Sequence, residues 1–103
     1  MYSKNAKFFI GQVVQHKRYG YRGVVIDVDP AYQSVNENMP KLSIKPQSSP
    51  WYHLLVHEQE NEKYVSERHL QPDMTGDPVD HPFVEMFFSD FKGQRYTPRH
   101  LIN

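Results

Sequence analysis

The sequence predicts a mainly β domain, a small barrel or sheet with polar loops and a short helix near the C-terminus. Residues 24–29 alternate apolar and polar side chains, as a half-buried strand does, and residues 51–57 are rich in aromatic and apolar side chains. Aromatic residues make up 14% of the chain, although hydrophobic residues make up only 38%. At 103 residues the chain suits one domain with one modest core.

The first predicted element is an antiparallel hairpin that joins residues 11–16 to residues 24–29 across a loop at 17–23. Gly20 and Gly23 are expected to take positive φ or to form a bulge. Alternation in the second strand places Val24, Ile26 and Val28 on one face and Val25, Asp27 and Asp29 on the other. Pro30 then ends the strand, because proline has no N–H to donate.

Two segments are expected to lie outside regular structure. Residues 1–7 are polar and basic and are predicted to form a flexible N-terminus. Residues 30–50 carry four prolines among serines and asparagines, which predicts a long loop within a single domain at 8–103.

A second hairpin is predicted from residues 51–57 and a short returning strand at 64–65. Tyr52, Leu54 and Val56 share one face of the first of these strands. Trp51, on the other face, is either a core aromatic or an interface anchor, with the core favoured. Residues 66–70 are expected to form one helical or 3₁₀ turn that ends on Leu70 as a core anchor.

The periodicity changes near the C-terminus. Apolar residues at 84, 87, 88 and 91 follow the spacing of an amphipathic helix over 83–91, which Pro82 would begin and Gly93 would close. Residues 95–101 are expected either to add an edge strand or to trail away. Because a core of this size would leave Phe83 or Met86 uncovered, we expect a homo-oligomer.

The composition and the missing motifs exclude several kinds of functional site. The chain has no cysteine, which excludes disulfides, thiolate metal ligands and cysteine nucleophiles. Neither a nucleophile elbow nor a phosphate-binding loop is found, so we expect no enzyme and no cofactor. No apolar run is long enough for a signal peptide or a membrane span, and a cytoplasmic location without a membrane partner is expected.

The candidate contact site is the tip of the first hairpin, made of Lys17, Arg18, Tyr19, Tyr21 and Arg22. The net charge is zero, yet residues 1–26 contain five cations and no acidic residue. Cations that meet phosphate, interleaved with tyrosines that stack on bases, are typical of a surface for DNA or RNA. In the alternative interpretation the tyrosines plug the end of the barrel and the cations pair with acidic residues of this chain.

Six histidines raise the question of a metal site. His53 and His57 lie four apart on a strand, about 13 Å from each other at ~3.3 Å per residue, so they do not chelate one ion together. Asp27 and Asp29 share a strand face, which leaves a metal-dependent hydrolase using them and nearby histidines as a third hypothesis. Solvent-facing carboxylates on a half-buried strand explain the same pattern, and we favour that interpretation.

Four blocks of sequence, in order over residues 8–70, resemble one known family. They are Phe8-x-Ile10-Gly11-Gln12-Val13-Val14-x-His16, then residues 20–30, then Pro50-Trp51-Tyr52-His53-Leu54-Leu55-Val56, and Tyr64-Val65-x-Glu67-x-x-Leu70. They are similar to the heat-shock protein Q family, also called the YccV-like hemimethylated-DNA-binding domain. The resemblance implies a small SH3-like β-barrel without catalytic activity in the cytoplasm.

The same resemblance implies two functions. The first is a stress-response regulator of proteolysis, which promotes degradation of particular or denatured proteins, including the replication initiator, by an ATP-dependent protease. The second is a protein that binds hemimethylated DNA at the replication origin. Protease regulation is the leading hypothesis at this point, and DNA binding through the hairpin tip is the alternative.

Overall fold

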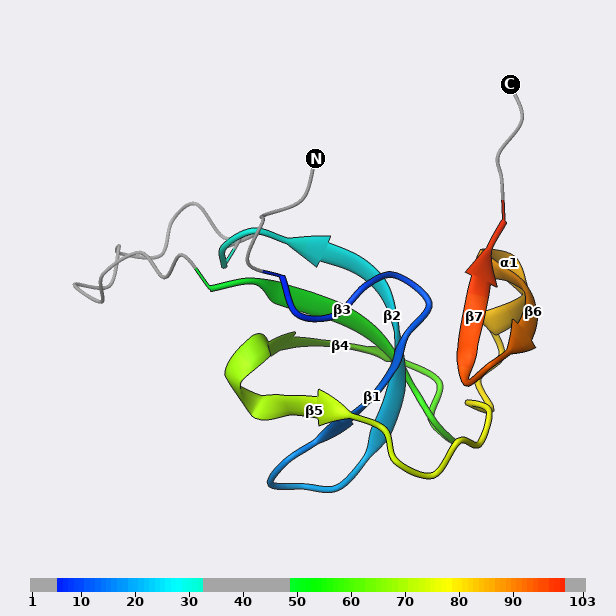
Figure 1. Cartoon of the computed structure of the whole chain (residues 1–103), viewed down its shortest axis with the longest axis horizontal. Coiled ribbons are helices and arrows are strands. Elements are labelled where there is room, and N and C mark those ends of the chain that lie inside the picture. Colours follow the sequence, from blue (N-terminus) through cyan, green and yellow to red (C-terminus); the bar gives the residue numbers. More distant parts are fainter. Residues whose placement is uncertain (1–5, 33–48, 100–103) are drawn as a thin grey trace.

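A computed structural model describes residues 6–32 and 49–99 of the chain (Figure 1). The elements in order are β1 (Val13–His16), β2 (Arg22–Asp29), β3 (Trp51–Val56), β4 (Glu62–Ser66), the 3₁₀ turn η1 (Glu67–His69), β5 (Leu70–Pro72), α1 (Val84–Phe87), β6 (Phe88–Lys92) and β7 (Arg95–Pro98). The predicted loop at 30–50 and the predicted flexible segment at 1–7 fall mostly outside the described residues. Within the second segment, the backbone N–H of Lys7 donates to the Glu67 carboxylate at 2.8 Å.

The main sheet has five antiparallel strands in the order β4-β3-β2-β1-β5. Its two edge strands, β4 and β5, are joined by only the three residues of η1. The sheet must therefore curl until its edges approach each other, as Figure 1 shows. No ladder joins β4 to β5 in the parts of the chain that the structure describes, so the sheet is open there. A mainly β fold is confirmed, whereas a closed barrel is not seen.

The concave side of the sheet holds the larger apolar core. Its buried side chains come from both predicted hairpins, and Leu70 anchors the end of η1 as expected. The core consists of Phe8, Val14, Val25, Val28, Tyr52, Leu54, Val56, Val65 and Leu70. At one end of this core the Tyr52 hydroxyl donates to Glu67 at 2.6 Å and accepts the N–H of Phe8 at 3.2 Å. Burial raises the pKa of Tyr52, so its phenol stays protonated and can donate.

The predicted faces of β2 hold for Val24, Val25 and Ile26 but are wrong from Asp27 onward. The ladder to β3 pairs Val25 with Leu54 and Asp27 with His53, so Ile26 is an extra residue in a β-bulge. A bulge inserts one residue and reverses the alternation after it. Val28 therefore joins Val25 in the concave core, while Ile26 packs with Val24 against the other cluster.

The helix predicted over 83–91 is also wrong in length. Only Val84–Phe87 is helical, and the backbone is extended from Phe88, where β6 begins. β6 pairs with β7, which confirms a strand at the C-terminal end. The aromatic residues of this hairpin pack on Tyr96, with ring centroids at 5.2 Å for Phe88 and 4.6 Å for Phe91. The apolar spacing of residues 84–91 suits a helix, but burial of Phe88 and Phe91 against Tyr96 favours the strand. The sequence alone does not show this burial.

The C-terminal hairpin covers the convex face of the main sheet. Its Phe88 and Tyr96 complete a second core with Val13, Val24, Leu55 and Val79. Gly11 allows the close approach, because its φ is +97° and an added Cβ would collide with the Tyr96 carbonyl oxygen. The Gly11 carbonyl accepts the N–H of Tyr96 at 2.8 Å, which ties the hairpin to the start of β1.

Candidate nucleic-acid interface

The tip of the first hairpin is a tight turn at residues 17–20. The N–H of His16 donates to the Tyr21 carbonyl at 2.8 Å, and the N–H of Gly20 donates to the His16 carbonyl at 2.9 Å. Gly20 has a φ of +79°, as the sequence predicted, in open surroundings. Gly23 lies inside β2, where an added Cβ would come within 2.9 Å of the Leu55 carbonyl. Its role is close strand packing rather than a turn.

His16 fixes the conformation of the tip from inside. Its Nδ1 accepts backbone N–H groups from Arg18 at 3.1 Å and from Tyr19 at 3.0 Å, and the side chain is buried. Burial, together with the nearby charges of His69 and Arg18, lowers the pKa of His16. The ring is therefore neutral at pH 7, with its proton on Nε2 because Nδ1 is an acceptor. The N–H of Lys17 also donates to the His69 carbonyl at 2.8 Å, which ties the tip to η1.

Three of the five predicted contact residues project from this tip. Lys17 and Arg18 are exposed, and Tyr19 keeps 70% of its surface accessible while its ring stacks on His16 at 4.7 Å. The Arg18 guanidinium lies over the Tyr19 ring at 5.8 Å. Within residues 6–32 and 49–99, no carboxylate forms an ion pair with Lys17 or Arg18. Both cations can therefore meet an anionic partner.

Tyr21 has an intermediate position. It is half-buried, packs against the concave core, and faces His16 with ring centroids 4.9 Å apart. The Lys63 ammonium of β4 lies 5.6 Å from its ring centroid. Burial and the neighbouring Tyr19 raise the pKa of Tyr21, so the phenol stays neutral. Tyr21 thus closes the end of the core with its ring, and Tyr19 does not.

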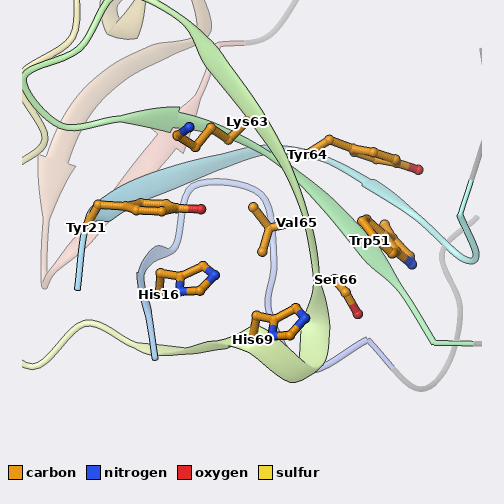
Figure 2. Close-up of a pocket in the computed structure, with 8 residues that line it drawn as sticks. All are labelled: His16, Tyr21, Trp51, Lys63, Tyr64, Val65, Ser66 and His69. Carbon is orange, nitrogen blue, oxygen red and sulfur yellow. The ribbon is translucent and has the colours of Figure 1, made fainter. Parts of the chain in front are cut away.

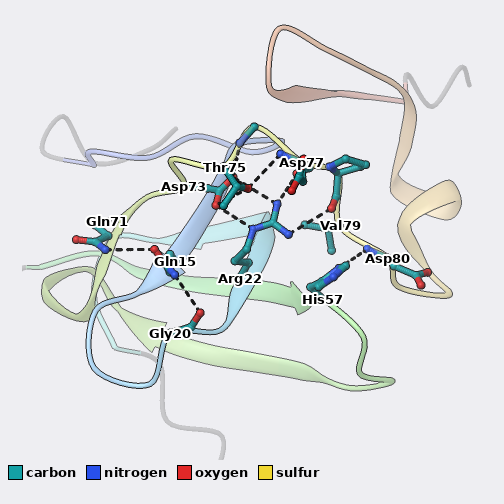
Figure 3. Close-up of polar contacts among 12 residues, drawn as sticks. Gln15, Gly20, Arg22, His57, Gln71, Asp73, Thr75, Asp77, Val79 and Asp80 are labelled. Atoms are coloured by element: carbon teal, nitrogen blue, oxygen red, sulfur yellow. Dashed lines mark hydrogen bonds and ion pairs between the residues drawn. The ribbon is translucent and has the colours of Figure 1, made fainter.

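Arg22, the fifth predicted contact, turns away from the tip (Figure 3). Its Nε lies 2.9 Å from Asp73 Oδ1, and its Nη atoms donate to the carbonyls of Asp77 and Pro78. The two side chains are 13% and 3% exposed. Although burial alone would raise it, hydrogen bonds from Arg22 and Thr75 lower the pKa of Asp73. Arg22 therefore holds the segment after β5 and is not offered to a partner.

A third group of polar residues lies on the convex face, beside the bulge. Single ligand atoms of Asp27, Asp29 and His53 lie within 4.8 Å of one another. Asp29 accepts hydrogen bonds from the Tyr64 hydroxyl at 2.7 Å and from His53 Nε2, 3.1 Å away. The sequence hypothesis joined the two aspartates to nearby histidines without naming one, and the register set by the bulge brings His53 beside them. His57 lies apart, where its Nδ1 accepts the N–H of Asp80. The hydrogen bonds to Asp29 hold Asp29 and His53 together, whereas Asp27 Oδ1 accepts the N–H of Val28 at 2.9 Å.

A second exposed surface consists of apolar side chains around α1. Phe83, Met86 and Phe87 are 46%, 68% and 38% exposed. We call these three residues the α1 patch. In the described parts of the chain, no helix combines the length and the apolar character needed to cross a membrane.

Comparison with known protein families identifies the family to which this chain belongs. A family model described as "Hemimethylated DNA-binding protein YccV like" matches residues 6–95. The chain belongs to the YccV-like family. The match confirms the resemblance seen at 8–70 and extends it through β6 to the first residue of β7. The C-terminal hairpin is therefore largely part of the YccV-like domain, and the description names DNA binding rather than a reaction.

Proposed function

We propose that this YccV-like protein binds hemimethylated DNA, with the tip of the first hairpin as the main contact with the DNA backbone. The observation that carries the proposal is the pair of exposed cations Lys17 and Arg18, which form no ion pair within residues 6–32 and 49–99, on a turn that His16 braces. The family description supports DNA as the partner. Tyr19 adds an exposed ring between these cations and the body of the domain. A preorganised tip loses little conformational entropy on binding, which favours affinity.

Fluorescence anisotropy with hemimethylated, fully methylated and unmethylated duplexes of one sequence tests this proposal. Two phosphate contacts predict a slope of log affinity against log salt near −1.8, from ~0.9 per contact. Lys17→Ala should weaken binding and reduce the slope by about 1. Lys92→Ala removes an equally exposed lysine on β6 and is the matched control. Absence of salt-dependent binding to all three duplexes would overturn the proposal.

A second proposed function is the regulation of proteolysis by an ATP-dependent protease in the heat-shock response. The α1 patch supports it, since exposed apolar side chains gathered in one place are typical of protein contacts. Met86→Glu should then abolish any acceleration of substrate degradation by the purified protease. Met74→Glu changes a methionine outside the patch that is more exposed than Met86 and should have no effect. Equal degradation rates with and without the protein, across candidate proteases, would remove this function.

Three finer expectations stand as proposals beside these functions. We propose an SH3-like barrel as the architecture, on the strength of the curled sheet whose edges η1 joins. Self-association through the α1 patch is proposed as well, and light scattering that shows a monomer at micromolar concentration would exclude it. A cytoplasmic location is proposed from the family resemblance, and cell fractionation tests it.

A further inference from the structure

A cleft of about 400 Å³ lies beside the tip, at the open edge of the main sheet (Figure 2). The two residues that flank the turn of the tip, together with β3, β4 and η1, form its walls, and Figure 2 shows their side chains with Val65 near the centre. The lining residues are His16, Tyr21, Trp51, Lys63, Tyr64, Val65, Ser66 and His69. Its volume falls within the range of small-ligand sites in proteins. The cleft exists because β4 is an edge strand and η1 carries the chain around to the other edge.

The lining of the cleft is aromatic and rich in hydrogen-bond donors. The rings of His16 and His69 are nearly parallel, with centroids 5.6 Å apart, and Tyr21 lies against His16 from the side. Lys63 brings an ammonium group to the same opening. Among the described residues that line the cleft, none carries a carboxylate. A planar ring with acceptor atoms and a nearby negative charge fits this lining, and a cationic ligand does not.

The cleft is continuous with the proposed DNA contact through His16. The His16 ring stacks on Tyr19, which belongs to the exposed tip, and also on His69, which lines the cleft. A DNA strand whose phosphates meet Lys17 and Arg18 therefore passes the mouth of the cleft. A base within a duplex is stacked and paired, so only a base that leaves the stack can reach such a site.

We propose that the cleft binds one unstacked nucleotide of the bound DNA, with its base against the Tyr21 and His69 rings, which His16 holds from behind, and its phosphate near Lys63. This inference rests on the proposed DNA-binding function and adds a site for a single base to it. Aromatic side chains accept any base on their faces, and each stacked base contributes about tenfold or more to affinity. Recognition of a methylated site then includes how easily a base leaves the helix, and not only the backbone contacts of the tip.

Two readouts on one set of duplexes test the inference. Hemimethylated duplexes carry 2-aminopurine in turn at each unmethylated adenine of the site, and anisotropy gives the affinity of each. Unstacking raises 2-aminopurine emission, so we expect an increase of several-fold at one position when the protein binds. The single tryptophan, Trp51, also lines the cleft, and its emission should change at the same protein-to-DNA ratio.

His69→Ala removes an exposed ring of the cleft without touching either core. It should abolish the 2-aminopurine increase and weaken binding about tenfold, with the salt slope unchanged because no phosphate contact is lost. Lys63→Gln is a second variant, and Gln59→Ala, in an exposed turn, is the control. Binding without 2-aminopurine increase at any position would overturn this inference and leave the proposed function standing. Absence of binding to every duplex would overturn both.

Discussion

The turn of the first hairpin and the strand pair directly behind it, which we call the base of the tip, place similar cations in opposite environments. Arg18, at the tip, is exposed and forms no ion pair with the described residues. Arg22, four residues later at the start of β2, is enclosed by Asp73 and the carbonyls of Asp77 and Pro78. The difference arises because the segment after β5, with Asp73 and Asp77, lies against Arg22 and leaves the turn uncovered (Figure 3). Side-chain chemistry alone therefore does not separate a binding cation from a structural one.

The largest expected effect that separates the two regions is on folding stability. Arg22→Ala would leave the buried carboxylate of Asp73 without its partner, and removal of one member of a buried pair costs about 3 kcal/mol or more. Arg18→Ala should change the free energy of unfolding by less than about 0.5 kcal/mol, as exposed substitutions do. Urea denaturation of both variants measures these values. Equal losses would show that the base is no more structural than the tip.

A second expected effect concerns acid stability at the base. Asp73 has a pKa below its usual 3.8 in the folded state, so the unfolded chain binds this proton at a higher pH than the folded chain. The stability from this group is therefore present above about pH 4 and is lost as the pH falls through the folded pKa. Asp73→Asn should be less stable at neutral pH and should lose less stability below pH 4. Thermal unfolding between pH 3 and 7 checks this, and parallel curves for the two proteins would contradict it.

The smallest expected effect concerns the tip and lies nearer to neutral pH. The pKa of His16 is below its usual 6.5 in the folded state, so the unfolded chain is protonated first as the pH falls. Stability is therefore complete above pH 6.5 and declines below it until the folded ring is protonated as well. His16→Asn keeps a side-chain acceptor for the N–H groups of Arg18 and Tyr19 but has no titration. Its unfolding free energy should fall less between pH 7.5 and 5.5, and identical declines would exclude His16 as the cause.

The local patterns predicted much of the fold. The strand at 51–57, the returning strand, the single turn before Leu70 and the positive φ of Gly20 all appear in the structure. Each of these depends on residues close together in sequence, where periodicity and turn chemistry act directly. The failures have non-local causes. The bulge at Ile26 depends on pairing with β3, and the strand at Phe88 depends on burial against Tyr96.

Some features of the candidate site could likewise be predicted from the sequence, and others could not. The cluster of cations and tyrosines at residues 17–22 is visible in the sequence, and so is the family resemblance that the comparison confirms. The sequence does not show that Arg22 is held in an ion pair, because its partner Asp73 lies 51 residues away. The contribution of Lys63 and His69 to the cleft is equally hidden, since β4 and η1 reach the tip only when the sheet curls.

The sequence by itself determined that this is a small, mainly β, cysteine-free domain of the YccV-like family with a basic, tyrosine-bearing turn. Those properties follow from composition and from spacings within single strands and turns. Only the tertiary structure decided which cations remain free, which face each residue after the bulge occupies, and where an aromatic cleft opens beside the tip. The physical reason is that burial, ion pairing and cavity shape depend on contacts between segments far apart in the chain, and a local pattern carries no record of them.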